Sequence, residues 1–146
     1  MKDLFVISVD FDGTLCENEY PYAGEPNMEL IECLKFLRRE RPNIRLVLNT
    51  MRECEPLRYA VRWCKRYGLE FDAVNDNIKE IKAEFGNNPR KIFANVYLDD
   101  HNVDINQFVK DTQDLFKNKE PHEKVKTKKE IISDPFAEMV NYLLRL

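Results

Sequence analysis

The sequence has no hydrophobic segment long enough to cross a lipid bilayer, which takes about 20 consecutive apolar residues. Its first apolar stretch, residues 4–9, has only the length of a β-strand. The amino terminus also lacks the pattern of a secretory signal, because Lys2 is followed at once by Asp3 and no apolar signal core comes after them. We therefore expect a protein that is neither inserted in a membrane nor secreted.

Cysteine and histidine are scarce, and neither forms a metal or catalytic motif. The cysteines lack the paired spacing of a zinc site and the density of a disulfide scaffold. The histidines are isolated and have no partner for a catalytic triad. We therefore expect inert thiols in the reducing cytoplasm and assign neither histidine a role. These residues are Cys16, Cys33, Cys54, Cys64, His101 and His122.

Length and composition are those of a soluble globular protein. The chain of 146 residues is 43% hydrophobic and 34% charged, which is enough for one domain with a single core. Its net charge of −3 gives no general attraction to nucleic acid.

The most informative segment is the apolar run that ends in Asp10-Phe11-Asp12-Gly13-Thr14. A run of this kind is typical of a buried parallel strand. Strand alternation would place Asp10 and Asp12 on the same side of the backbone, at the carboxyl end, where open α/β sheets bind ligands. Two adjacent carboxylates favour a hard cation such as Mg²⁺. The alternative, a hairpin with an Asp-Gly turn, fails because residues 14–20 make a poor partner strand.

Strands and helices alternate along the rest of the chain. We expect helices over residues 26–41, 56–67, 78–85 and 104–116, and strands over residues 44–48, 71–74 and 95–98. Residues 11–24 show no periodicity and are expected to form a loop or short flap. This order predicts a three-layer α/β fold, a Rossmann-like parallel sheet flanked by helices.

The first motif resembles that of the haloacid dehalogenase-like (HAD) phosphatases, which read Asp-any residue-Asp-Gly-Thr after a hydrophobic strand. Thr50, at the end of the next strand, is similar to the second motif, a Ser or Thr. Asp99 and Asp100 resemble the fourth motif, although one acid could instead cap a helix, a role that Asp104 could fill. The third motif is a lysine, which the spacing leaves open among Lys91, Lys79 and Lys82.

The resemblance implies a magnesium-dependent phosphomonoester hydrolase with an aspartyl-phosphate intermediate. Asp10 would be the nucleophile and Asp12 the general acid and base, while Thr50 and Lys91 would hold phosphate oxygens. Mg²⁺ would be bound by Asp10, the main-chain carbonyl of Asp12, and Asp99, with Asp100 close by. The residues Asn49 and Arg52 are candidates for substrate binding, although a solvated Arg52 is an equal alternative.

The resemblance also bears on domain organisation and substrate. Neither interval between motifs has room for a cap domain, so the chain resembles capless members, whose open sites admit bulky substrates. We expect a HAD-like catalytic domain over residues 1–116, a lysine-rich connector over 117–130, and a last helix over 131–146 that packs on the domain or on a partner. The substrate could be a nucleotide or a nucleic-acid end, and a homo-oligomer is possible. A non-catalytic binding module is the alternative from another class.

Overall fold

The structure, a computed structural model, describes residues 3–117. Its contacts divide the chain into a unit that ends at Asp100 and a second unit that begins at His101. This boundary precedes the one expected at residue 116, so the helix before the connector belongs with the second unit. The expected connector, apart from Lys117, and the expected last helix lie outside the described residues.

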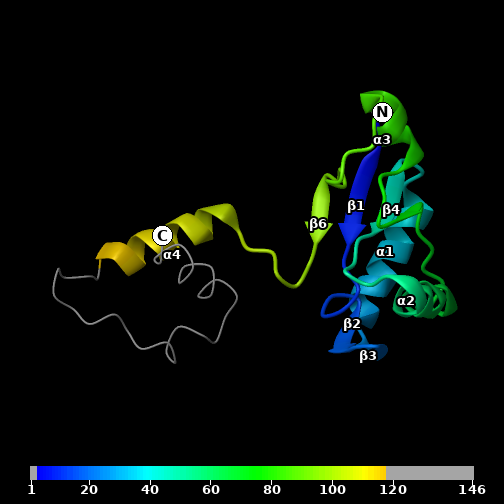
Figure 1. Cartoon of the computed structure of the whole chain (residues 1–146), viewed down its shortest axis with the longest axis horizontal. Coiled ribbons are helices and arrows are strands. Elements are labelled where there is room, and N and C mark those ends of the chain that lie inside the picture. The colour runs from blue at the N-terminus through cyan, green and yellow to red at the C-terminus, as the bar shows by residue number, and fades with distance from the viewer. Residues whose placement is uncertain (1–2, 118–146) are drawn as a thin grey trace. The chain divides into compact units, whose positions relative to one another are not determined.

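The first unit is built on a parallel sheet of four strands. In spatial order they are β5 (Ala73–Val74), β4 (Ile44–Leu48), β1 (Phe5–Val9) and β6 (Val96–Leu98). Of these, β1, β4 and β6 are labelled in Figure 1. Val9 is in register with Leu48 on one side and with Leu98 on the other. The three strands therefore end at the same edge of the sheet, as the sequence predicts.

Helices pack on both faces of this sheet, because alternate strand residues point to opposite sides. On one face, Ile7 and Leu46 pack with α1 (Met28–Glu40) and α2 (Cys54–Arg66). On the other face, Val6 and Val47 pack with α3 (Lys79–Phe85). The predicted α/β class with a parallel, Rossmann-like sheet between helices is thus confirmed.

The helix boundaries follow local sequence signals. Asn27 caps α1, since its side-chain oxygen accepts the N–H of Leu30 at 3.2 Å. Gly86 ends α3 in the left-handed conformation, with φ of 68°. The helix α2 begins at Cys54, two residues before the expected proline.

Residues 11–24 were expected to form a loop or short flap without regular structure, and this prediction is wrong for half of them. They contain β2 (Cys16–Glu19) and enter β3 (Tyr22–Pro26), which pair as an antiparallel hairpin. The register shifts between Cys16 and Asn18. Most hairpin side chains are exposed or half-buried, so the strands lack the apolar alternation by which sequence reasoning identifies a hairpin.

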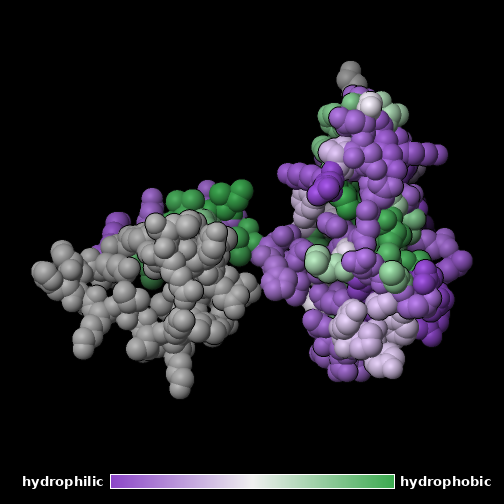
Figure 2. All heavy atoms as spheres, viewed as in Figure 1, coloured by the Kyte–Doolittle hydropathy of each residue, from purple (hydrophilic) through white to green (hydrophobic). Residues whose placement is uncertain are grey.

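The second unit contains α4 (Ile105–Lys117), as expected. Asp104 caps it by accepting the N–H of Gln107 at 2.8 Å. Across the described residues, no helix is long and apolar enough to span a membrane. Figure 2 shows that the visible surface of the first unit is mainly hydrophilic, with smaller hydrophobic areas.

Candidate active site

The carboxyl edge of the sheet brings Asp10, Asp99 and Asp100 together. Asp10 directly follows β1, and its N–H donates to the carbonyl of Leu98 at the end of β6, 2.9 Å away. Asp99 and Asp100 come next after Leu98. One carboxylate oxygen from each of the three acids lies within 4.8 Å of the others. Three of the four predicted metal ligands therefore meet in space.

Gly13 makes room for this arrangement. Its φ of 81° lies in the left-handed region, and a Cβ added there would stand 2.2 Å from Oδ2 of Asp100. A larger residue would therefore push Asp100 out of the cluster while also straining the backbone. Both the positive φ and the close approach of Asp100, which follows the neighbouring strand β6, therefore favour glycine at position 13.

The cluster places two further carboxylates beside the half-buried carboxylate of Asp10. Burial, followed by the charges of Asp99 and Asp100, raises the pKa of Asp10 from 3.8 to about 7, against the opposing hydrogen bond from the Phe11 N–H. That N–H donates to Oδ1 of Asp10 at 2.8 Å. A divalent cation would relieve the repulsion, and three carboxylates are the hard oxygen ligands that Mg²⁺ prefers. The residues present therefore fit such an ion.

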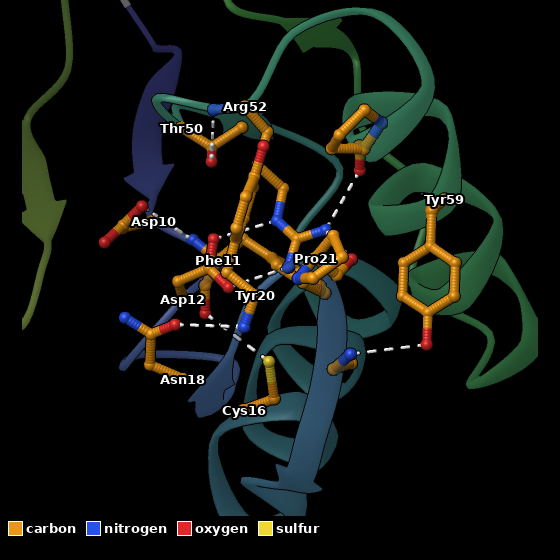
Figure 3. Close-up of polar contacts among 12 residues, drawn as sticks. Asp10, Phe11, Asp12, Cys16, Asn18, Tyr20, Pro21, Thr50, Arg52 and Tyr59 are labelled. Atoms are coloured by element: carbon orange, nitrogen blue, oxygen red, sulfur yellow. Dashed lines mark hydrogen bonds and ion pairs between the residues drawn. The ribbon is translucent and has the colours of Figure 1, made fainter.

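Asp12 takes a different direction from Asp10, which corrects the expectation of a shared side. The chain turns tightly after β1, since the N–H groups of Thr14 and Leu15 both donate to the carbonyl of Phe11. Strand alternation therefore stops at this turn. The carboxylate of Asp12 instead pairs with Arg52, as seen in Figure 3.

Arg52 is enclosed by the protein rather than open to a substrate. Its Nε and one terminal nitrogen donate to the two oxygens of Asp12, each at 2.8 Å. The remaining N–H groups donate to the carbonyls of Pro21, Tyr22 and Pro56 at 2.8–3.1 Å. Its side chain is 1% exposed, so the five N–H groups are all satisfied internally. The structure thus gives no opening for the predicted direct contact of Arg52 with substrate.

Thr50 lies in a loop that is fixed by a residue the sequence analysis missed. The main-chain N–H of Thr50 donates to Oδ1 of Asn75 at 2.8 Å, and Nδ2 of Asn75 donates to the carbonyl of Arg52 at 3.1 Å. Asn75 follows β5 with φ of 50°, a conformation that asparagine tolerates better than most residues. An asparagine directly after a short strand was the available signal. Asn49 is the other predicted residue here. Its main-chain N–H donates to the carbonyl of Val9 at 2.8 Å and so extends the pairing of β4 with β1.

The structure distinguishes the three candidate lysines only in part. Lys82 pairs with Asp76 at 2.5 Å, and this contact, with that of Asn88, lowers the pKa of Asp76. Lys79 and Lys91 are exposed. The assignment of the catalytic lysine therefore stays a prediction.

Comparisons with known proteins place the chain in a family. No protein-family model matches the chain, and no curated protein sequence matches it. Among solved structures, it is similar to a conserved protein from Bacteroides thetaiotaomicron, with 34% identity and a TM-score of 0.59. The match covers 90% of this chain and 99% of the other. The fold and site define an α/β protein with an acidic cluster at the carboxyl edge of its sheet, and the chain belongs to the family of that conserved protein.

The raised pKa of Asp10 predicts how metal binding depends on pH. Between about pH 4 and pH 7 the metal-free folded state holds a proton that the unfolded state has lost, so Asp10's contribution to the free energy of unfolding falls as pH rises from about 4 to about 7 and then levels off. A cation must displace that proton at low pH but not at high pH. A Mg²⁺ concentration a hundredfold above the Kd at pH 8 should stabilise the protein by about 2.7 kcal/mol at pH 8, and the same concentration should stabilise it by clearly less at pH 5.5.

Thermal unfolding with Mg²⁺ or with EDTA at the two pH values measures this difference. In Asp10→Asn, which cannot titrate at this position, the Mg²⁺ effect should lose most of its pH dependence. A Mg²⁺-induced shift that is as large at pH 5.5 as at pH 8 would contradict the assignment.

Proposed function

We propose that the protein is a HAD-like, magnesium-dependent phosphomonoester hydrolase that works through an aspartyl-phosphate on Asp10. The observation that carries the proposal is the meeting of Asp10 with Asp99 and Asp100 at the sheet edge, while Asp12, two residues away, is held separately by Arg52. A phosphatase of this kind needs one carboxylate at a cation and a second that can exchange protons.

Asp10 is the proposed nucleophile. The N–H of Phe11 holds one of its oxygens at 2.8 Å, so the orientation of the carboxylate is fixed. Attack on phosphorus requires the ionised form, and burial, followed by the charges of Asp99 and Asp100, opposes that ionisation by raising the pKa of Asp10 in the metal-free site. Asp10, Asp99 and Asp100 would hold Mg²⁺, with the carbonyl of Asp12 as a further candidate. When bound, the ion supplies positive charge that offsets the carboxylates and the phosphate oxygens.

Asp12 is the proposed proton donor and acceptor. As the bond from Asp10 to phosphorus forms, the bond to the leaving oxygen breaks, and Asp12 gives that oxygen a proton. Water then attacks phosphorus, Asp12 takes back a proton, and phosphate leaves Asp10. The turn after β1 keeps Asp12 close to Asp10 in the chain but in a different electrostatic setting.

Thr50 and the surrounding main chain are proposed to bind phosphate oxygens. The hydroxyl of Thr50 accepts the N–H of Arg52 at 3.2 Å, which leaves its own proton available to an anion. The hold of Asn75 on this loop keeps the hydroxyl in place.

The first unit is consistent with an open site. Between β1 and β4 it contains the hairpin β2–β3 and α1, and between β4 and β6 it contains α2, β5 and α3. None of these described elements forms a separate cap domain, which supports the proposal of a capless enzyme with a bulky substrate.

The four cysteines are free, which supports a role in the reducing cytoplasm.

Variants of the two first-motif aspartates test the mechanism. The phenoxide of phenyl phosphate is a poor leaving group and needs a proton, whereas the nitrophenoxide of para-nitrophenyl phosphate needs one far less. We expect Asp12→Asn to lower kcat/KM for phenyl phosphate by about 10²–10⁴, and to lower it less for para-nitrophenyl phosphate. Asp10→Asn should abolish turnover of both, because the covalent route is lost.

Steady-state assays with Mg²⁺, and with EDTA as the metal-free control, measure these effects. Turnover by Asp10→Asn at the wild-type rate would refute the covalent mechanism. Binding of Mg²⁺ by wild-type protein without hydrolysis of any phosphomonoester would instead favour the non-catalytic binding module.

A second candidate function, hydrolysis of phosphorylated nucleic-acid ends, is favoured by a groove on α2. The groove has a volume of about 490 Å³ and is lined by Tyr59, Arg62, Lys65 and Arg66. Cations beside an aromatic ring are the elements with which proteins bind single-stranded nucleic acid. The chain has a net charge of −3, so this local group of cations is not simply a result of overall composition.

Charge reversal on the groove distinguishes the two candidates. With an oligonucleotide bearing a terminal phosphate, Arg62→Glu together with Arg66→Glu should raise KM by about tenfold or more at low salt. The same double variant should leave kcat/KM for para-nitrophenyl phosphate unchanged. Equal kinetics of the variant and the wild type on the oligonucleotide would argue against this candidate.

A further inference from the structure

Arg52 joins the side chain of Asp12 to the tip of the hairpin β2–β3. With Nε and one N–H of its second terminal nitrogen it holds both oxygens of Asp12. With two further N–H groups it holds the carbonyls of Pro21 and Tyr22, at the tip of the hairpin β2–β3. The guanidinium is a rigid planar fork, so a shift of the hairpin tip moves the group that holds Asp12.

The surroundings of Arg52 confine it to this position. Its guanidinium carbon lies 4.7 Å from the ring centre of Phe11, 5.0 Å from that of Tyr20 and 5.9 Å from that of Tyr59. Figure 3 shows the ring of Tyr20 beside Arg52. Hydrogen bonds to Asp12 raise the pKa of Arg52 above its ordinary value. The guanidinium is therefore a fixed charge with little freedom to turn toward solvent.

The hairpin tip is also the part of this arrangement that a substrate can touch. Tyr20 and Tyr22 are 60% and 67% exposed. Besides the hydrogen bonds of Arg52, two contacts among the described residues join this region to α2. The N–H of Ala23 donates to the hydroxyl of Tyr59 at 3.3 Å, and the rings of Tyr22 and Tyr59 meet edge-on. The tip can therefore respond to a group placed against it.

We propose that Arg52 is a positioning residue that couples the hairpin tip, residues 20–22, to Asp12, so that a leaving group in contact with Tyr20 and Tyr22 sets the position of the acid–base carboxylate. The catalytic part of this inference rests on the proposed phosphatase function, whereas the coupling itself does not. A solely structural Arg52 would stabilise the hairpin without affecting what Asp12 does.

Hydrogen exchange of the metal-free protein tests the coupling without any assay of activity. Removal of the Asp12 carboxylate should loosen the grip of Arg52 on the tip, so we expect amides of residues 18–24 to exchange about tenfold faster in Asp12→Ala. Asp10→Ala is the matched control: it removes an aspartate two residues away that is not among the hydrogen-bonding partners of Arg52, and it should leave hairpin exchange near the wild-type rate. Unchanged hairpin exchange in Asp12→Ala would overturn the proposal.

A kinetic double-mutant cycle tests the catalytic consequence. Tyr20→Leu changes an exposed side chain at the tip, and we expect it to lower kcat for phenyl phosphate by about tenfold when Asp12 is present but by less than twofold in the Asp12→Asn background. Arg52→Lys keeps the charge but offers a single ammonium group, so its loss of kcat should likewise not add to that of Asp12→Asn. Losses that add in full would show that Arg52 and the tip act independently of Asp12.

A control and a second readout keep the two proposals separate. Arg58→Lys alters an exposed arginine of α2 that pairs with Glu55, and it should leave kcat and KM unchanged. If wild-type protein hydrolyses no phosphomonoester, the proposed function fails, and the exchange experiment still decides whether Arg52 couples the tip to Asp12.

Discussion

Repulsion among three carboxylates at one edge of the sheet is the constraint on which the proposed site depends. Asp10, Asp99 and Asp100 meet because β1 and β6 are parallel neighbours in register at Val9 and Leu98. An antiparallel arrangement would have sent the acids to opposite ends of the strands. The backbone favours this gathering, since Gly13 leaves space for Asp100 and the N–H of Phe11 holds Asp10. The fold therefore maintains a concentration of negative charge that side chains in water would avoid.

The two aspartates of the first motif lie in opposite electrostatic environments, although only one residue separates them. Asp10 is half-buried and faces other acids, and its burial, followed by their charges, raises its pKa to about 7. Asp12 faces a guanidinium whose five N–H groups are donated within the protein. The tight turn at Phe11 creates this difference, because the alternation of the strand does not continue from Asp10 to Asp12. Two carboxylates in one short segment thus have different electrostatic surroundings.

Much of the fold could be predicted from the sequence because the relevant signals are local. The buried strand β4 matches its predicted range, and Asn27 and Gly86 mark helix ends through side-chain capping and backbone freedom. The convergence of Asp10 with Asp99 followed from the parallel topology alone. The hairpin β2–β3 could not be predicted in the same way, since its exposed strands carry little hydrophobic alternation.

The missed parts of the site depend on contacts between residues far apart in sequence. In the sequence, Arg52 is a charged residue shortly after a strand, with nothing to indicate burial. It is buried because Asp12, the hairpin and α2 all contact its guanidinium. The direction of Asp12 depends in turn on the presence of that charge. Asn75 accepts a hydrogen bond from the main chain of Thr50, which lies 25 residues earlier in the sequence. Such partnerships have no sequence spacing that sets them apart from surface residues, so only the three-dimensional structure shows them.

The most direct measurement is a titration with Mn²⁺, a paramagnetic substitute for Mg²⁺, followed by electron paramagnetic resonance. If the three carboxylates form one cation site, wild-type protein will bind one ion per chain in this site, and Asp10→Asn and Asp99→Asn will each weaken binding by about 10–100-fold. The carboxylate of Asp12 pairs with Arg52 instead, so Asp12→Asn will bind Mn²⁺ with nearly the wild-type affinity. Equal affinity in all of these proteins would contradict the shared site.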